Sequence, residues 1–279
     1  MLQDLTVQIH AIRSLDMRVA VFPTARLPAL PLDWWRSTKR DEGWWNAWFE
    51  RYKAFVLSHA ELAQQTGASA LILGGEWVLP ALPNGKIAGD SSGVPADAEA
   101  RWEDILETAR AHFTGYLLWA LPYPDGLASA PDSLLSNVDG LYLLWYAPLS
   151  HSNTATPDEM AIAAGLLLDS EVLPLQERLG KPVILAIAYP SVDGAAQAWM
   201  PLPLLLQPGN GQGQVDLQEQ ADIYQALLMA INQRPWVGGF VSRGFYPPVI
   251  VHDTSATVYG KPAAGVLWYW YPRLLGLTP

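Results

Sequence analysis

The chain has 279 residues, of which half are hydrophobic and only 16% carry a charged side chain. That composition predicts a single globular domain over residues 1–279, because α/β barrels commonly reach this length as one domain. The net charge of −10 disfavours nucleic acid and anionic membrane surfaces as partners, since both attract basic proteins. No apolar run reaches the ~18 residues of a membrane span. The absence of cysteine excludes disulfides and thiolate metal sites.

Short hydrophobic runs alternate with helical patterns along the whole chain. In chain order, the runs that predict strands are residues 18–22, 68–73, 115–121, 141–146, 182–188 and 237–241. Apolar residues at helical spacing predict helices over residues 2–15, 44–65, 97–112, 158–179 and 217–233, and near the end of the chain over 265–276. Continuously hydrophobic strands are typical of a parallel sheet buried on both faces. The alternation therefore predicts an α/β fold with right-handed crossovers.

The lengths of the connections favour a (β/α)₈ barrel. Helix-to-strand links are short, whereas strand-to-helix links are long and rich in Pro, Gly and Trp. Such elaboration beyond the carboxyl ends of the strands is where a barrel builds its active site. Six βα units are present where a closed barrel has eight, so we expect the first two strands and one helix to be missing upstream of this sequence. No glycine-rich phosphate loop follows any strand, which disfavours a nucleotide cofactor.

Glu76 is the first candidate for chemistry. It follows the predicted strand at 68–73, after two glycines and before Trp77. A carboxylate at the carboxyl end of a barrel strand points into the mouth of the barrel, and the glycines permit close approach of a ligand. Solvated Glu residues at strand ends are also common, so the position alone does not establish a role.

Tryptophan is unusually abundant. The chain has 13 Trp residues, including the doublets at Trp34–Trp35 and Trp44–Trp45, which lie outside the predicted strands. Packing in the core is the ordinary explanation for any one of them. The alternative is a cleft that stacks on sugar rings, because an indole face matches the apolar face of a pyranose. That alternative predicts partial exposure of Trp77, Trp145 and Trp34 or Trp35 above the strands.

The order of these motifs resembles the glycoside hydrolase family 113 mannanases, which are retaining barrels. The resemblance runs from Met17 to Trp270 and is carried by MRVAVFP, WWNAWFERYKAFVLSHAELAQQTGASALILGGEW, LLSNVDGLYLLWYAPLS, GKPVILAIAYPSVDGAA and GKPAAGVLWYW. It implies a carbohydrate partner, no cofactor and, in its usual setting, a compartment outside the cytoplasm. It also implies that the missing strands are the first two of the barrel.

The resemblance assigns roles residue by residue. Glu76 matches the general acid/base, and Tyr146 matches the Tyr whose hydroxyl holds the nucleophile. Tyr189 and Ser191 match a conserved stretch after the seventh barrel strand, and substrate-binding roles are expected for Trp34, Trp35, Trp77, Trp145, Tyr146 and Tyr189. The position of the nucleophilic Glu, however, is occupied by Ala186.

Two further positions depart from the family pattern. Gly75 stands where the family has a polar residue before the acid/base. The position of the Trp that the family carries on its eighth strand falls near Ser242–Arg243 in this chain. A retaining glycosidase needs two carboxyl groups ~5–5.5 Å apart, and a methyl group cannot form the covalent intermediate. Asp125 and Asp193 could serve as a relocated second carboxylate, although both stand in ordinary turn sequences. The five scattered His residues indicate no metal site.

Three functions follow from this pattern. The first is a barrel that binds β-linked polysaccharide or oligosaccharide and is catalytically impaired. The second is an active glycoside hydrolase that uses Glu76 and a relocated carboxylate, and the third is a structural domain of a larger protein. An incomplete barrel would leave unpaired strand edges, so we also expect upstream polypeptide or a partner chain to cover them.

Overall fold

The computed structural model describes residues 2–152, 154–198, 213–245 and 252–277. The chain divides into two compact units, Met1–Tyr142 (unit 1) and Leu143–Pro279 (unit 2), and each is described by itself. Among the described residues, no helix combines the length and the hydrophobicity needed to cross a membrane. Whether the two units form the single domain that was expected stays a prediction.

The six predicted strands are all present and form one parallel sheet with the order β1-β2-β5-β6-β7-β8. Their bounds are β1 (Ala20–Val21), β2 (Ala70–Gly74), β5 (Tyr116–Pro122), β6 (Gly140–Trp145), β7 (Val183–Ile187) and β8 (Val237–Ser242). Sequential order with a helical crossover after each strand is the pattern of six consecutive units of a (β/α)₈ barrel. The predicted fold class is confirmed. β1 and β8 are the terminal strands of the sheet.

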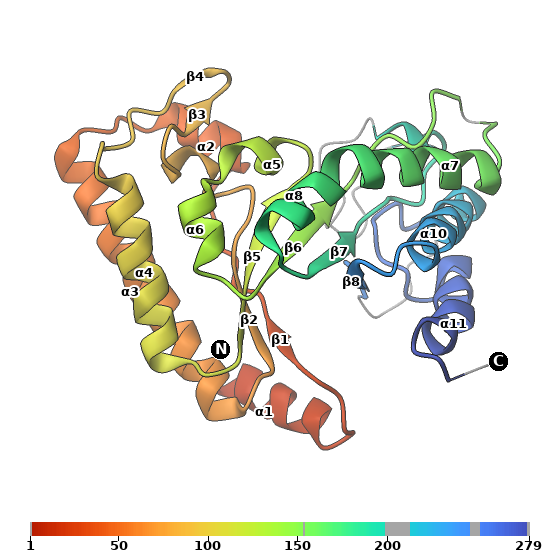
Figure 1. The fold of residues 1–279 in the computed structure, drawn as a ribbon, viewed down its shortest axis with the longest axis horizontal. Helices are drawn as coiled ribbons and strands as arrows, with labels where there is room; N and C mark the ends of the chain where they lie inside the picture. The colour runs from red at the N-terminus through yellow and green to blue at the C-terminus, as the bar shows by residue number, and fades with distance from the viewer. Residues whose placement is uncertain (1, 153, 199–212, 246–251, 278–279) are drawn as a thin grey trace. The chain divides into compact units, whose positions relative to one another are not determined.

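Unit 1 is built on two long helices, which lie side by side in Figure 1. These are α3 (Glu42–Thr66) and α4 (Ala98–His112), and the shorter α1 (Leu2–Arg13) packs against α3. The Asp41 carboxylate accepts the Trp44 N–H at 2.8 Å and so caps the start of α3. Gly67 ends the helix in the left-handed conformation. Apolar residues at helical spacing explain why the sequence predicted both long helices.

The long linkers of unit 1 contain elements that periodicity did not predict. They hold α2 (Pro31–Ser37), the 3₁₀ helix η1 (Leu79–Ala81), the hairpin of β3 (Lys86–Ile87) and β4 (Asp90–Ser91), α5 (Asp125–Ser129) and α6 (Asp132–Ser136). Each is shorter than the window over which helical or strand periodicity becomes visible.

Unit 2 packs α10 (Leu217–Asn232) between α7 (Pro157–Leu167) and α11 (Pro262–Leu274). The helix predicted over 158–179 is divided into α7, a π-helical turn (Leu168–Val172) and α8 (Leu173–Leu179). The wide turn comes just before Pro174, which has no N–H to donate to the preceding turn. The short helix η3 (Ala195–Gln197) follows β7. The predicted linkers 190–216 and 246–261 lie partly outside the described residues.

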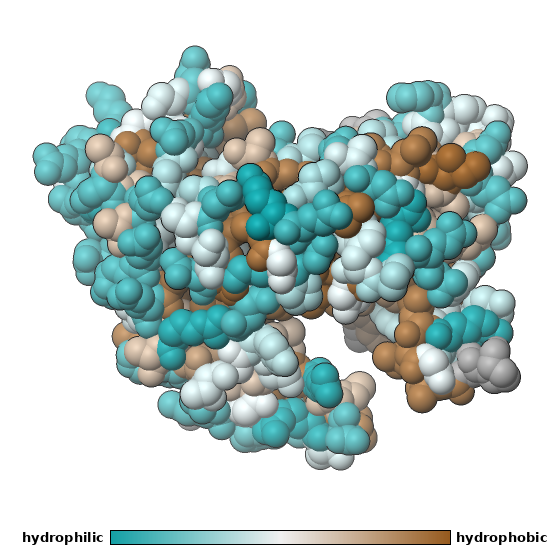
Figure 2. Space-filling model, viewed as in Figure 1, coloured by the Kyte–Doolittle hydropathy of each residue, from teal (hydrophilic) through white to brown (hydrophobic). Residues whose placement is uncertain are grey.

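Unit 2 also exposes large apolar side chains. Trp268 of α11 and Leu275, directly after that helix, are 85% and 69% exposed, and Ile162 and Leu166 of α7 are exposed as well. Figure 2 shows the corresponding brown surface over α7 and at α11. Apolar surface that gathers in this way is typical of contact sites rather than of a free surface.

Close packing at the end of β2 gives a test of the fold. Gly74 has a φ of +87°, and an added Cβ would lie 2.7 Å from the Trp119 ring and 2.9 Å from the Ala120 carbonyl oxygen. Gly89 has a φ of +94° but open space around it, so it provides a matched control. Gly74→Ala should lower the free energy of unfolding by about 1–3 kcal/mol more than Gly89→Ala, because only Gly74→Ala adds overpacking to backbone strain. Equal losses in denaturant titrations would contradict this packing.

Candidate functional site

Glu76 lies directly beyond the carboxyl end of β2 and is partly exposed. Gly74 and Gly75, both with positive φ, turn the backbone at this point. Within the described part of the chain, we find no hydrogen bond or ion pair that engages the Glu76 carboxylate. The structure thus presents an accessible carboxylate at the strand end where the sequence expected one.

A buried hydrogen bond joins this loop to helix α2. The Trp35 indole N–H donates to the Trp77 carbonyl oxygen at 3.0 Å, and both side chains are buried. Trp34 is the neighbour of Trp35 on α2 and is half-buried, with ring centroids 5.0 Å apart. Trp35 therefore holds the loop that follows β2 and contains Glu76, whereas the Trp34 side chain stays partly exposed.

The expected exposure is wrong for Trp77 and Trp145, whereas of the pair Trp34 or Trp35 it is Trp34 that is partly exposed. Trp35, Trp77 and Trp145 are 1%, 7% and 0% exposed, so in this conformation they cannot stack on a sugar. The physical reason is aromatic packing, since indole rings bury large apolar areas and favour edge-to-face contacts. In unit 1 the rings form one continuous cluster of Trp34, Trp35, Trp44, Trp45, Trp48, Phe49, Tyr52, Phe55, Trp77, Trp102 and Trp119.

In unit 2, Ala186 is fully buried near the end of β7 and pairs with Val241 of β8. Tyr189 follows on the same segment and is also fully buried. Its hydroxyl donates to the Ala147 carbonyl oxygen at 2.6 Å and accepts the Ala147 N–H at 3.1 Å. Tyr189 therefore links the segments that follow β6 and β7. Its complete burial does not support the expectation that it contacts sugar. Tyr146 is partly exposed, with its ring 5.2 Å from that of Tyr189.

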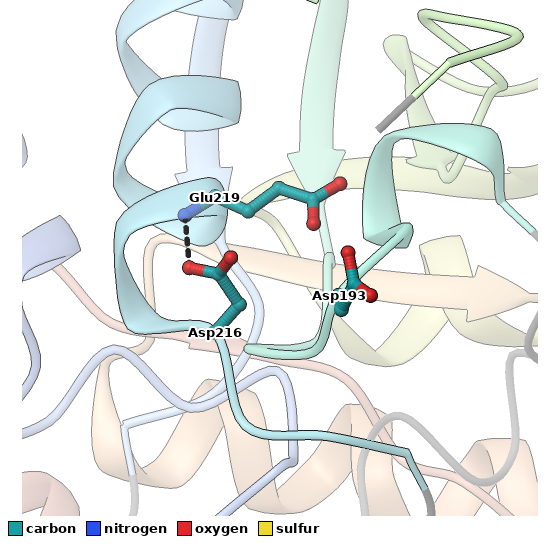
Figure 3. A group of neighbouring side chains, drawn as sticks. All are labelled: Asp193, Asp216 and Glu219. Atoms are coloured by element: carbon teal, nitrogen blue, oxygen red, sulfur yellow. Dashed lines mark hydrogen bonds between the residues drawn. The ribbon is translucent and has the colours of Figure 1, made fainter. Parts of the chain in front are cut away.

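The two candidate second carboxylates lie in different settings. Asp125 is exposed at the start of the short helix α5. Asp193 is exposed and lies close to Asp216 and Glu219, with one carboxylate oxygen of each residue within 4.8 Å of the others (Figure 3). Burial and the charges of Asp216 and Asp193 raise the pKa of the Glu219 carboxyl.

The acidic trio has a visible structural role. Glu219 accepts the Gly194 N–H at 2.7 Å and the Ala196 N–H at 2.9 Å, which fixes the loop after β7. Asp216 accepts the Glu219 N–H at 2.8 Å and caps α10. Three carboxylates at this spacing are also the kind of group that can hold a divalent cation. The bonds from backbone N–H groups already give Glu219 and Asp216 a structural role.

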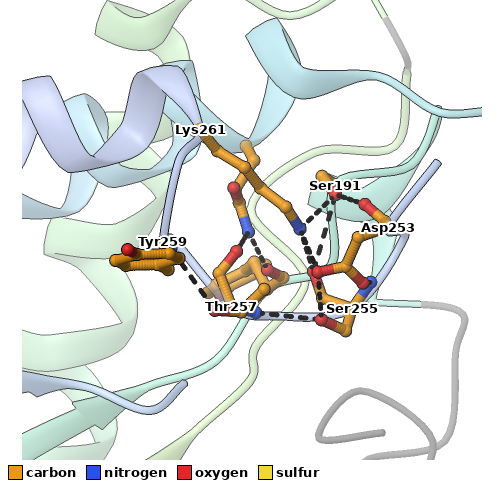
Figure 4. A network of polar contacts seen from close by, with 8 residues as sticks. Ser191, Asp253, Ser255, Thr257, Tyr259 and Lys261 are labelled. Carbon is orange, nitrogen blue, oxygen red and sulfur yellow. Dashed lines mark hydrogen bonds and ion pairs between the residues drawn. The ribbon is translucent and has the colours of Figure 1, made fainter. Parts of the chain in front are cut away.

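A second polar network also holds the loop after β7 (Figure 4). The Lys261 ammonium donates to the Ser191 hydroxyl at 2.8 Å and to the Ser255 carbonyl oxygen at 2.9 Å. It also pairs with the Asp253 carboxylate at 3.4 Å, and both charged side chains are only 5% exposed. Burial lowers the pKa of the Lys261 amine, and the Asp253 charge opposes that shift. The network attaches the segment before α11 to the loop after β7.

Comparisons with known proteins fit this geometry. The model of Glycoside Hydrolase Family 113 matches residues 3–246. The chain belongs to glycoside hydrolase family 113. Among solved structures, a β-1,4-mannanase of this family in a complex superposes with a TM-score of 0.73 at 21% identity, over 97% of this chain and 79% of that one. A comparison with curated proteins gives no match.

Two further family 113 structures resemble the chain. One is another β-1,4-mannanase structure, with a TM-score of 0.69 at 20% identity over 97% of this chain and 79% of that chain. The other is the β-mannanase from Alicyclobacillus acidocaldarius in complex with ManMIm, with a TM-score of 0.67 at 19% identity over 99% and 79%. At these identities the likeness establishes the fold and does not transfer the chemistry.

Sequence reasoning did not find the Lys261–Asp253 pair or the bonds from the loop after β7 to Glu219. Both depend on contacts between segments that are distant or separated by loops without periodicity. The available signal was weak: Lys261 precedes Pro262 at the start of a helix, a place where a charged residue is ordinarily solvated.

The buried ion pair gives a stability prediction. Lys261→Met should lower the free energy of unfolding of this family 113 chain by about 3–5 kcal/mol, because it leaves the Asp253 carboxylate buried without its cation. The double variant Lys261→Met, Asp253→Asn should lose much less than the sum of the two single losses. Denaturant unfolding of the four proteins measures the coupling. Additive losses would show that the pair is not an energetic unit.

Proposed function

We propose that this chain binds β-linked polysaccharide or oligosaccharide at the carboxyl ends of its strands, and that retaining hydrolysis is impaired. The observation that carries the proposal is Ala186 at the end of β7, where the resemblance to the family expects the nucleophilic carboxylate. Glu76, the counterpart of the general acid/base, remains accessible at the end of β2.

Family membership and fold support the choice of ligand. Family 113 structures described as β-1,4-mannanases share this fold, so β-linked mannan is the first polysaccharide to test. Trp34 and Tyr146 are the two aromatic candidates that keep partial exposure, one in each unit. Aromatic faces beside a few polar groups are the usual lining of a small-molecule site.

Loss of the nucleophile supports binding without turnover. Glu76 could protonate a leaving group, but Ala186 offers no atom that can bond to the anomeric carbon. An active enzyme would need another carboxylate on the opposite side of the sugar ring. Asp125 and Asp193 are the candidates for that alternative, and Asp193 already lies among other carboxylates.

The catalytic part is tested by restoring the missing group. Wild type should not hydrolyse aryl β-mannosides, whereas Ala186→Glu should yield detectable hydrolysis, because covalent catalysis divides one difficult step into two easier ones. Ala186→Gln is the matched control, since it adds the same bulk at this buried position without a nucleophile. Its thermal unfolding shows whether the extra volume is tolerated. Glu76→Gln added to Ala186→Glu should abolish the activity on substrates with poor leaving groups.

Active wild type would give the opposite result. If it releases sugar at rates typical of glycosidases and Glu76→Gln alone abolishes this, the impairment proposal is wrong. Asp125→Asn and Asp193→Asn would then identify the second carboxylate. If wild type neither binds nor cleaves any β-linked glycan, the structural-domain alternative is favoured.

We also propose that polypeptide covers the open edges of β1 and β8, either an upstream segment or a partner chain. The terminal position of both strands and the exposed apolar face of α11 support this. An unpaired strand edge in water promotes association, and proteins usually cover it.

Trp268→Ser tests whether another polypeptide covers the exposed apolar face of α11. Ile162→Ser on α7 is the control for a similar loss of exposed apolar surface. If a second copy covers α11, sedimentation should show an oligomer that Trp268→Ser dissociates. If another polypeptide covers it, the isolated chain should be monomeric and bind a hydrophobic dye, and Trp268→Ser should reduce dye binding. A monomer that binds no dye would contradict an unpartnered edge.

A further inference from the structure

A guanidinium with one buried nitrogen that has no hydrogen-bond partner lies at the carboxyl end of β8. Arg243 follows the last residue of the strand, and its backbone N–H donates to the Ile187 carbonyl oxygen at 2.8 Å. The Nη1 atom is buried and has no hydrogen-bond partner in the described part of the chain, although the side chain as a whole is partly exposed. None of the ion pairs found among the described residues includes Arg243.

Contacts identify the outer face of β8. The Ser242 hydroxyl lies 2.8 Å from the Tyr224 hydroxyl of α10. The Phe240 ring stacks on Tyr271 of α11, with ring centroids 4.8 Å apart. Phe240 and Ser242 therefore face the helices that cover the strand.

The opposite face of β8 carries Val241. Side chains alternate along a strand, so Val241 lies on the face that Phe240 and Ser242 do not use. Ala186 of β7 pairs with Val241, and residues paired across parallel strands share a face. Arg243 follows in a bend just beyond the strand, and its charge opposes the raised pKa of the Tyr224 hydroxyl. The cation therefore lies at the carboxyl end of β8, the edge of the sheet where a barrel builds its site.

Other partly buried cations in unit 2 are paired. Lys261 has Asp253 and Ser191, and Arg234 forms two hydrogen bonds to the Asp169 carboxylate, at 2.8 and 2.6 Å. A buried donor left without an acceptor is destabilising, and more so when it is charged. Arg243 departs from this pattern, and a ligand that supplies the acceptor would recover that cost.

We propose that Arg243 binds the carboxylate of an acidic sugar, so that the glycan bound by this chain contains a uronate. The proposal rests on the proposed carbohydrate-binding function and names the class of sugar. A guanidinium matches a carboxylate with two parallel hydrogen bonds, whereas a neutral sugar offers only hydroxyl groups. The net charge of −10 disfavours a long polyanion, so the ligand is a short or sparsely charged glycan with one carboxylate at this position.

The experiment compares two trisaccharides that differ in charge. Calorimetry at low salt should show that wild type binds a β-1,4-linked mannuronate trisaccharide about tenfold more tightly than mannotriose, the scale expected for charge-assisted hydrogen bonds. Arg243→Met should remove this preference, and Arg243→Lys should keep part of it, because the charge remains while the paired geometry is lost. Arg51→Met, at an exposed position of α3, is the control for the change in net charge.

The outcomes separate the two proposals. If wild type binds mannotriose as tightly as the uronate and Arg243→Met changes neither affinity, the acidic-sugar proposal fails and carbohydrate binding stands. If Arg243→Met retains the preference for the uronate, another residue reads the carboxylate and this assignment is wrong. If neither trisaccharide binds wild type, both proposals fail. Thermal unfolding of Arg243→Met and Arg243→Lys confirms that the compared proteins are folded.

Discussion

The parallel register between β7 and β8 is the constraint on which the chemistry of unit 2 depends. Backbone hydrogen bonds set Ala186 beside Val241 and Ile187 beside Ser242, whatever side chains these positions carry. Parallel neighbours present paired residues to the same face, so Ala186 and Val241 share one face of the sheet. The sheet can therefore keep its register whatever side chain position 186 carries, which is why the proposed loss of the nucleophile at Ala186 is compatible with the family fold.

Two kinds of interaction compensate the buried charges of unit 2. Lys261 and Asp253 neutralise each other, and Glu219 receives two backbone N–H groups, so these groups hold loops in place at a tolerable desolvation cost. Arg243 has a buried nitrogen with neither kind of compensation among the described residues. A buried donor left without an acceptor among the described residues is destabilising, and a ligand that supplies the acceptor would remove that penalty.

How far the sequence predicted this molecule depends on the range of the signal. Each strand of the six-stranded sheet and each long helix was predicted, because continuous hydrophobic runs and helical periodicity report directly on burial. Helix α2 and the β3–β4 hairpin were missed, since they are held by contacts such as the Trp35–Trp77 hydrogen bond, which has no local signature. The position of Glu76 was predicted because the end of a strand can be read from sequence. The burial of Trp77 and Trp145 was not predicted, because composition does not say which aromatic rings pack against each other.

The two proposals act in the same direction on catalysis. Cleavage of a glycoside passes through a transition state with positive charge at the anomeric carbon, which the nucleophilic carboxylate of a retaining enzyme stabilises as it attacks. Under the proposed function Ala186 stands in the place of that carboxylate, so this stabilisation is lost. The proposed role of Arg243 sets a cation at the carboxyl end of β8, where it would repel the developing positive charge and attract a carboxylate in the ground state. On these two proposals the site favours binding an acidic ligand over cleaving it, and Glu76, as a proton donor alone, does not replace the missing carboxylate.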